Sequence, residues 1–352
     1  MTRSTREVFG GVDTHKDQHH GAVVDGTGKI LDNAAFPASL AGYRALLKWM
    51  KSFGHLSRVG VEGTSSYGMN LVRHLNANNV HVVEVNRPNR QDRRRHGKSD
   101  PADAEAAARA ALNGDAVGVP KRHDGPVESI RLLRIARRSA VSERTATINQ
   151  IRTVINTCCN ELGDELRKLS GSLLASRCAR LRPNGQLADP AVAAKETLRV
   201  LGQRLIFMND QIKALDTQLS SLVTHIAPAL IEQVGVGIDT AGALLVAAGQ
   251  NAERLQSEAA FAAICGVSPV DASSGKQHRH RLNRGRNREA NAALWRIALV
   301  RMSCHQPTKD YVAKRTAQRK TKREILRCLK RYITRQLFPL LVHTTQTTSQ
   351  AA

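Results

Sequence analysis

The sequence is poor in aromatic residues, which make up 3% of it, although 41% of its residues are hydrophobic. Its cores must therefore be built from Leu, Ile, Val and Ala. No run of about 18 or more apolar residues occurs, which argues against a membrane-spanning helix. The first residues lack the apolar core of a secretory signal. The 352 residues are nonetheless enough for two or three domains.

Cysteines are few and scattered. The six occur at positions 158, 159, 178, 265, 304 and 328. They show neither the spacing of metal ligands nor the density of a disulfide framework. We therefore expect free thiols in a reducing cytoplasm.

Acidic residues are also scarce, since 30 Asp and Glu oppose 53 Lys and Arg and leave a net charge of +23. Between Lys276 and Arg335, 19 lysines and arginines face three acidic residues. A second basic cluster consists of Arg87, Arg90, Arg93, Arg94, Arg95 and Lys98. Such clusters indicate a polyanionic partner, because neutralised phosphates release condensed counterions. Apolar residues between the cations favour folded helices over a solvated tail, so we predict nucleic-acid binding.

Residues 1–120 have the pattern of an α/β domain, in which short apolar runs alternate with amphipathic stretches. Three strands are expected within 8–31, closed by a turn at 25–28. They are followed by a helix at 40–53, a strand at 58–62, a helix at 67–78, a strand at 80–85 and a helix at 101–112. This is the order of ribonuclease-H-like (RuvC-like) folds, whose mixed sheet presents acidic residues from strand ends and a late helix.

Residues 121–227 have the pattern of long helices. The second half repeats apolar residues with coiled-coil spacing at Leu198, Leu201, Leu205, Met208, Ile212, Leu215, Leu219, Leu222 and Ile226. The first half shows the same spacing from 141 to 162. We predict an antiparallel helical hairpin, which could pack within one chain, although its length favours the arm of a dimer.

Residues 228–340 predict a mostly helical, basic domain, and the polar residues 341–352 predict a disordered tail. Gly235 and Gly237 lie in a segment typical of a helix-hairpin-helix, whose backbone amides can approach a DNA phosphate. An ordinary glycine turn is the alternative.

Ser273 and Ser274 precede Gly-Lys among cations, where a hydroxyl could attack a phosphodiester. From the residues alone, a common turn is the favoured interpretation there.

Four acidic residues lie at predicted element ends. Asp13 and Glu62 end strands, whereas Asp100 and Asp103 begin a helix. Helix capping explains the second pair, with Asp100 as N-cap. Residues three apart share a helix face, so all four carboxylates can also converge. Converging carboxylates repel one another unless a cation is bound. The hard, oxygen-preferring Mg²⁺ (or Mn²⁺) fits such a site.

Three segments together resemble the DEDD transposases of the insertion sequence 110 family. They are Gly-Val-Asp13-Thr-His-Lys, Val-Glu62-Gly-Thr and Lys-Ser-Asp100-Pro-Ala-Asp103-Ala. The glycine segment near 235 and the run from 269 to 287 resemble that family's C-terminal domain. The resemblance implies a RuvC-like domain whose four acidic residues bind a divalent metal.

The resemblance also implies a serine nucleophile in the C-terminal domain. Ser274 is our first choice because it adjoins the glycine, with Ser273 as the alternative. It further implies excision and insertion of DNA guided by a structured noncoding RNA, in a dimer or tetramer, within the nucleoid of a bacterial cytoplasm.

We therefore expect a metal-dependent, RNA-guided DNA transposase. The residues expected to contact nucleic acid are Arg93, Arg94, Arg95, Lys98, Gly235, Gly237, Lys276, Arg279, Arg281, Arg284 and Arg286. Two alternatives remain. The first is a RuvC-like junction nuclease, in which metal-activated water attacks the phosphate. The second is a non-catalytic nucleic-acid-binding protein whose acidic residues are caps and turns.

Overall fold

The computed structural model describes residues 6–85, 99–116, 118–158, 161–251, 254–271, 280–281, 283 and 287–350. The chain divides into two compact units. The first comprises Met1–Gly125, Ala248–Ile264 and Leu341–Ala352, and the second Pro126–Ala247 and Cys265–Leu340. This division differs from the expected one, because 248–264 groups with the N-terminal residues.

Asn251 explains part of that difference. Its side chain is fully buried. Its Nδ2 donates to the carbonyl of Pro120 at 3.2 Å, and its Oδ1 accepts from the amide of Arg122 at 3.2 Å. One amide side chain thus satisfies two backbone groups of a distant segment, which ties 248–264 to the N-terminal residues.

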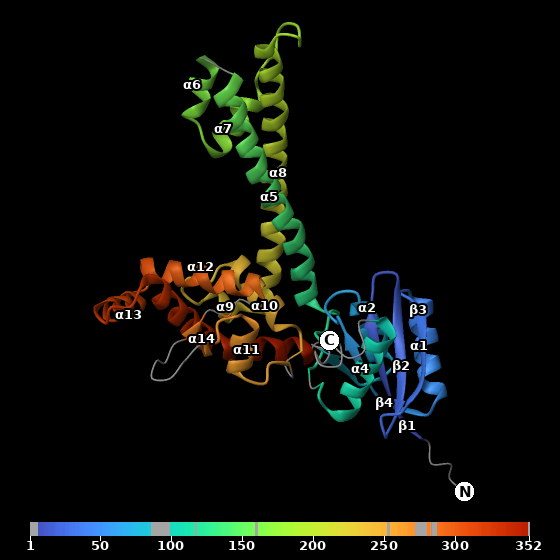
Figure 1. The fold of residues 1–352 in the computed structure, drawn as a ribbon. Coiled ribbons are helices and arrows are strands. Elements are labelled where there is room, and N and C mark those ends of the chain that lie inside the picture. The colour runs from blue at the N-terminus through green and yellow to red at the C-terminus, as the bar shows by residue number, and fades with distance from the viewer. Residues whose placement is uncertain are drawn as a thin grey trace. The chain divides into compact units, whose positions relative to one another are not determined.

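The first unit is built on a five-stranded mixed sheet in the order β3-β2-β1-β4-β5 (Figure 1). Its strands are β1 (Glu7–Thr14), β2 (Gln18–Asp25), β3 (Ile30–Pro37), β4 (His55–Glu62) and β5 (Val82–Val85). The first three strands pair antiparallel, whereas β1, β4 and β5 run parallel. The observed succession of strands and helices is the one predicted, and the mixed sheet agrees with a ribonuclease-H-like domain.

Helices cover both faces of this sheet. They are α1 (Leu40–Ser52), α2 (Met69–Ala77) and α4 (Asp100–Asn113). Successive strand residues face opposite sides, so Gly10 of β1 faces Met50 of α1, whereas Gly11 faces α4. The core beneath α1 and α2 is mainly aliphatic, as the low aromatic content predicts, with Leu46 and Leu71 fully buried.

Two glycines let α4 lie directly on the sheet. A Cβ atom at Gly11 would lie 2.1 Å from the carbonyl oxygen of Ala104, and one at Gly60 would lie 2.4 Å from that of Ala107. The facing side of α4 is also made of small residues, since Ala104, Ala107 and Ala108 are buried. Backbone therefore packs against backbone, and α4 is held close to β1.

The second unit contains the predicted helical hairpin. Its long helices α5 (Pro126–Cys158) and α8 (Pro190–Ile226) pack antiparallel within one chain (Figure 1). The short helices α6 (Glu161–Arg167) and α7 (Gly171–Ala179) complete one of its cores. Leu198 and Leu205 are buried in that core. The same chain therefore covers these positions of the apolar repeat.

The remaining elements are helical apart from one short strand pair. They are α9 (Pro228–Ile231), α10 (Ile238–Ala248), α11 (Glu258–Ile264), β6 (Val270–Asp271), β7 (His280–Arg281), α12 (Arg288–Cys304), α13 (Gln306–Ala317) and α14 (Lys322–Gln350). The helix α14 continues through residues 341–350, where a disordered tail was expected. Leu337 and Leu341 are fully buried, which stabilises this last part of the helix. Among the described residues, no helix combines the length and hydrophobicity needed to cross a bilayer.

Candidate active site

Two of the predicted acidic residues lie at the ends of neighbouring parallel strands. Asp13 is next to the end of β1 and Glu62 ends β4, and the register pairs Val12 with Val61. The hydroxyl of Thr14 donates to the carbonyl oxygen of Glu62 at 2.8 Å, which ties the two strand ends together. The Asp13 side chain is only 9% exposed. It lies on the α4 face, which it shares with Gly11.

The start of α4 differs from the prediction. Ser99, not Asp100, is the N-cap, because the carbonyl oxygen of Ser99 accepts the amide of Asp103 at 3.0 Å. Asp100 is therefore the first helical residue. Its carboxylate oxygens lie 3.4 Å from His15 Nε2 and 3.8 Å from His20 Nε2. N-capping thus does not account for Asp100, whose side chain is directed toward the sheet.

Asp13, His15 and Asp100 form one group of possible metal ligands. One ligand atom from each lies within 4.8 Å of the others, and His15 Nε2 is 3.0 Å from Asp13 Oδ2. Glu62 and Asp103 lie outside this group. Glu62 nevertheless ends the adjacent strand, and Asp103, 5% exposed, lies in the first turn of α4. The structure therefore brings two of the four acidic residues together.

The two histidines were not predicted from the sequence. His15 lies two residues after Asp13, a spacing that places side chains on the same face of a strand. His20 is the cross-strand partner of Asp13 in the β1–β2 hairpin. Strand period and hairpin register were therefore the signals that could have found them.

The donor set fits a divalent cation. Carboxylate oxygens are the ligands that Mg²⁺ and Mn²⁺ prefer. Asp13 is nearly buried, and two converging carboxylates repel each other unless positive charge is nearby. Among the described residues, the ion-pair partners of these two carboxylates are the imidazoles of His15 and His20. Asp13 and Asp100 are thus the residues best placed to hold a metal.

The predicted serines and most predicted nucleic-acid contacts lie outside the described residues. They are Ser273, Ser274, Arg93, Arg94, Arg95, Lys98, Lys276, Arg279, Arg284 and Arg286. Arg281 is described, is exposed and belongs to β7.

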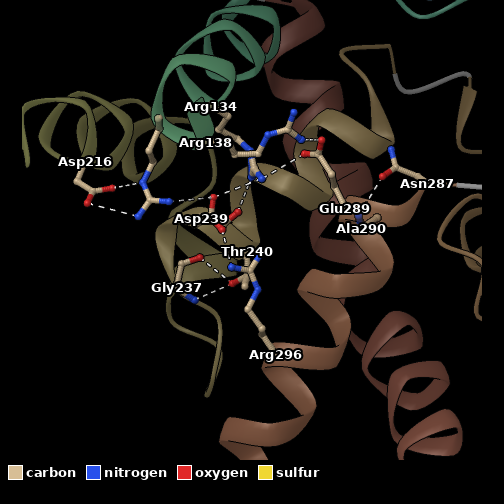
Figure 2. Close-up of polar contacts among 11 residues, drawn as sticks. Arg134, Arg138, Asp216, Gly237, Asp239, Thr240, Asn287, Glu289, Ala290 and Arg296 are labelled. Carbon is tan, nitrogen blue, oxygen red and sulfur yellow. Dashed lines mark hydrogen bonds and ion pairs between the residues drawn. The ribbon is translucent and has the colours of Figure 1, made fainter. Parts of the chain in front are cut away.

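The two predicted glycine contacts join α9 to α10. Gly235 has a φ of +79°, which fits a tight turn. It packs on α12, where an added Cβ would lie 3.1 Å from the carbonyl oxygen of Ile297. The amide of Gly237 donates to Thr240 Oγ1 at 3.0 Å (Figure 2). Packing and local hydrogen bonding therefore explain this turn, and phosphate contacts from it remain a prediction.

A network of ion pairs around the buried Arg134 joins α10 and α12 to α5 (Figure 2). The Arg134 side chain is 5% exposed and donates to the backbone carbonyl of Asp239 at 2.6 Å. It also lies 3.4 Å from Glu289 of α12, and Arg296 lies 2.8 Å from Asp239. Burial lowers the pKa of Arg134, whereas the charge of Asp239 opposes this shift.

The network matters because it lies at the beginning of α12. Asn287 caps this helix by accepting the amide of Ala290 at 3.0 Å. In the sequence, Asn287 ends the segment 269–287, which contains both predicted serines. The contacts of Glu289 therefore anchor the chain at the point where that segment ends. Arg134 was missed because an arginine among other arginines in a helical pattern is usually on a solvated face.

Comparison with known proteins gives the family. Residues 10–160 match the IS110 DEDD transposase model, described as "Transposase". Residues 227–313 match the model described as "Transposase IS116/IS110/IS902 family". The chain belongs to the IS110 family of transposases. The first match contains the acidic residues, and the second contains the glycine turn and both predicted serines.

A curated relative agrees with this assignment. The chain is 31% identical over 144 residues to the "Insertion element IS110 uncharacterized 43.6 kDa protein" of Streptomyces coelicolor. The matched stretch covers 40% of this chain and 35% of that protein. The chain thus aligns with about a third of the length of this relative.

Proposed function

We propose that this IS110-family protein is a DNA transposase that excises and inserts an insertion sequence by metal-dependent phosphodiester chemistry. The observation that carries the proposal is the approach of Asp13 and Asp100, which come from β1 and α4 and share His15 as a neighbour. The match of residues 10–160 to a transposase family supports a catalytic role for this approach.

Asp13 and Asp100 would bind the metal directly, with Glu62 and Asp103 completing the set. Glu62 lies beside Asp13 at the strand ends, and Asp103 lies in the same helical turn as Asp100. A bound Mg²⁺ or Mn²⁺ would supply charge stabilisation to the phosphate. The protein's own contribution is to hold the carboxylates rigidly on a sheet and a packed helix.

Ser274 is the proposed nucleophile, with Ser273 as the alternative. Its hydroxyl oxygen would attack phosphorus, forming a serine–phosphate bond while one sugar oxygen leaves. The preserved phosphoester energy would then drive strand transfer to a second DNA end. Support comes from the position of both serines inside the matched segment 227–313 and from the surrounding positive charge.

A structured guide RNA and a homo-oligomer, dimer or tetramer, complete the proposal. The net charge of +23 supports extensive contact with phosphates. RNA retained by the purified protein would be sequenced to identify such a guide. Light scattering of the purified protein would measure the oligomeric state.

The metal site is tested with Asp13→Asn. We expect DNA cleavage to fall by at least about 100-fold, because the substitution removes a ligand charge. Mn²⁺ binding, followed by electron paramagnetic resonance, should weaken in parallel. The matched control is Asp115→Asn, which changes an exposed acidic residue of the same unit. If Asp13→Asn cleaved DNA like wild type, a non-catalytic nucleic-acid-binding protein would be the better description.

A RuvC-like junction nuclease is the second candidate, because the same mixed sheet and acidic residues would serve it. In that enzyme water attacks the phosphate, and the serines are turn residues. The two candidates differ in whether DNA becomes covalently attached to the protein.

A further inference from the structure

The second unit contains a groove of about 840 Å³ between α13, α14 and the β6–β7 pair. We call it the α13–α14 groove and define it by Pro269, Arg281, Tyr311, Arg315, Tyr332 and Arg335, which line it with others. Among the described residues that line it, seven are arginine or lysine and one, Glu324, is acidic.

The single acidic residue does little to neutralise this groove. Glu324 Oε2 accepts hydrogen bonds from the amide and the hydroxyl of Thr321, both at 2.8 Å, and so caps the start of α14. With seven cations against one carboxylate among the described residues, the concave surface is predominantly positive. Such a surface concentrates field lines and attracts a polyanion.

Aromatic rings distinguish this groove from an ordinary basic face. Two of the four tyrosines in the protein, Tyr311 and Tyr332, pack edge to face there with centroids 5.4 Å apart. The guanidinium of Arg315 lies 5.8 Å from the Tyr311 ring, and that of Arg335 lies 5.9 Å from the Tyr332 ring. Tyr332 is 49% exposed. An exposed ring beside arginines in a basic groove is the usual platform for stacking a nucleic-acid base.

The second tyrosine stays neutral in this setting. The pKa of Tyr311 is raised to about 12, chiefly by burial and next by the neighbouring Cys328. A tyrosine hydroxyl is protonated near neutral pH, and this shift extends the neutral form to higher pH, so Tyr311 brings no negative charge into the groove.

We propose that the α13–α14 groove binds an unpaired segment of nucleic acid, with one base stacked on Tyr332 and phosphates bound by Arg315 and Arg335. This inference rests on the proposed function, which supplies the nucleic acid. The segment must be unpaired because a base inside a duplex has both faces covered by its neighbours. Its sugar could be deoxyribose or ribose, since both share this chemistry.

The position of the groove suggests its use. Pro269 and Arg281 line it, and they lie on either side of the predicted serine segment in the sequence. Strand transfer exposes unpaired DNA, and a guide RNA exposes unpaired loops. A strand held here would lie beside Pro269 and Arg281, between which Ser274 lies in the sequence.

The test uses the full-length protein and fluorescence anisotropy with a labelled 20-nucleotide single strand and the matching duplex, each as DNA and as RNA. Tyr332→Leu should weaken single-strand binding about five-fold or more, because stacking contributes about 1–3 kcal/mol per base. Tyr332→Phe should bind like wild type. Duplex binding should be unchanged in both variants. Whichever single strand, DNA or RNA, the wild type binds more tightly shows whether the sugar of the bound segment is deoxyribose or ribose.

Phe207→Leu is the matched control, because it removes an aromatic ring that is 57% exposed on α8. It should leave binding unchanged. Arg335→Gln should reduce the slope of log affinity against log salt concentration by about 0.7, the value for one phosphate contact on a single strand. Far-ultraviolet circular dichroism would verify that each variant is folded.

Equal single-strand binding by wild type and Tyr332→Leu would overturn the inference. So would Tyr332-dependent binding of a polyglutamate peptide that displaces the labelled strand from the wild type, because it would indicate an acidic protein partner. If the wild type bound no nucleic acid at all, the proposed function would fail with it. If the wild type bound and cleaved DNA but Tyr332 made no difference, only the groove would be refuted.

Discussion

At the scale of single residues, the described ion-pair partners of Asp13 and Asp100 are imidazoles. His15 lies 3.0 Å from Asp13 and 3.4 Å from Asp100. In a chain with a net charge of +23, this is notable, because arginines are abundant elsewhere. A guanidinium would neutralise both acidic residues permanently, whereas imidazoles leave them available to a metal.

A third histidine predicts how stability depends on pH. His19 is fully buried in β2 and stacks on Tyr43 with ring centroids 5.6 Å apart. Burial lowers its pKa below 6.5, so below that pH the unfolded chain binds a proton that the folded chain resists. Its contribution to stability is therefore complete above about pH 6.5 and is lost as the pH falls below that value.

His19→Phe should make the loss of stability between pH 7 and pH 5 shallower. Urea unfolding at several pH values in this range measures it. The control is His55→Phe, which changes an exposed histidine of the same sheet and should keep the wild-type slope. A slope for His19→Phe equal to that of wild type would show that His19 titrates alike in both states.

At the scale of elements, the close packing of α4 on the sheet determines where Asp100 and Asp103 lie. Gly11→Ala would place a methyl group 2.1 Å from the carbonyl oxygen of Ala104, so α4 must move away from β1. We expect destabilisation of about 1–3 kcal/mol, or more, because backbone cannot give way as a side chain can. Weaker Mn²⁺ binding should accompany it, since the helix carries part of the site.

Gly26→Ala is the control for this prediction. An added Cβ there meets nothing within 4 Å, so the change should stay within about 0.5 kcal/mol. Thermal unfolding of both variants makes the comparison. Equal melting temperatures for Gly11→Ala and wild type would mean that α4 does not rest on β1 as described.

The elements also show which features can be read from sequence. The strands around the turn at 25–28 were predictable because turn chemistry and alternation are local signals. The continuation of α14 was not, because it depends on the burial of Leu337 and Leu341 among distant residues. The four acidic residues could be predicted because each lies at the end of a strand or at the start of a helix. His15, His20 and Arg134 were missed because their roles depend on register and tertiary packing.

At the scale of the whole molecule, the chain combines an acidic set in the first unit with basic residues concentrated in the second. The predicted serines follow the acidic set by about 170 residues in the sequence. We propose that both take part in one reaction. A nuclease that used water would need only the acidic residues, so the covalent step separates the two proposals.

The most direct measurement is the capture of a protein–DNA adduct. The protein is incubated with Mg²⁺ and a suicide substrate whose cleaved strand cannot religate, then digested and examined by mass spectrometry. The account predicts DNA attached to the peptide containing Ser274, an adduct retained by Ser273→Ala and lost in Ser274→Ala. Attachment of DNA at Ser273 would support the same covalent mechanism, with Ser273 as the nucleophile in place of Ser274. No adduct from wild type, together with normal cleavage by Ser274→Ala and Ser273→Ala, would contradict the account.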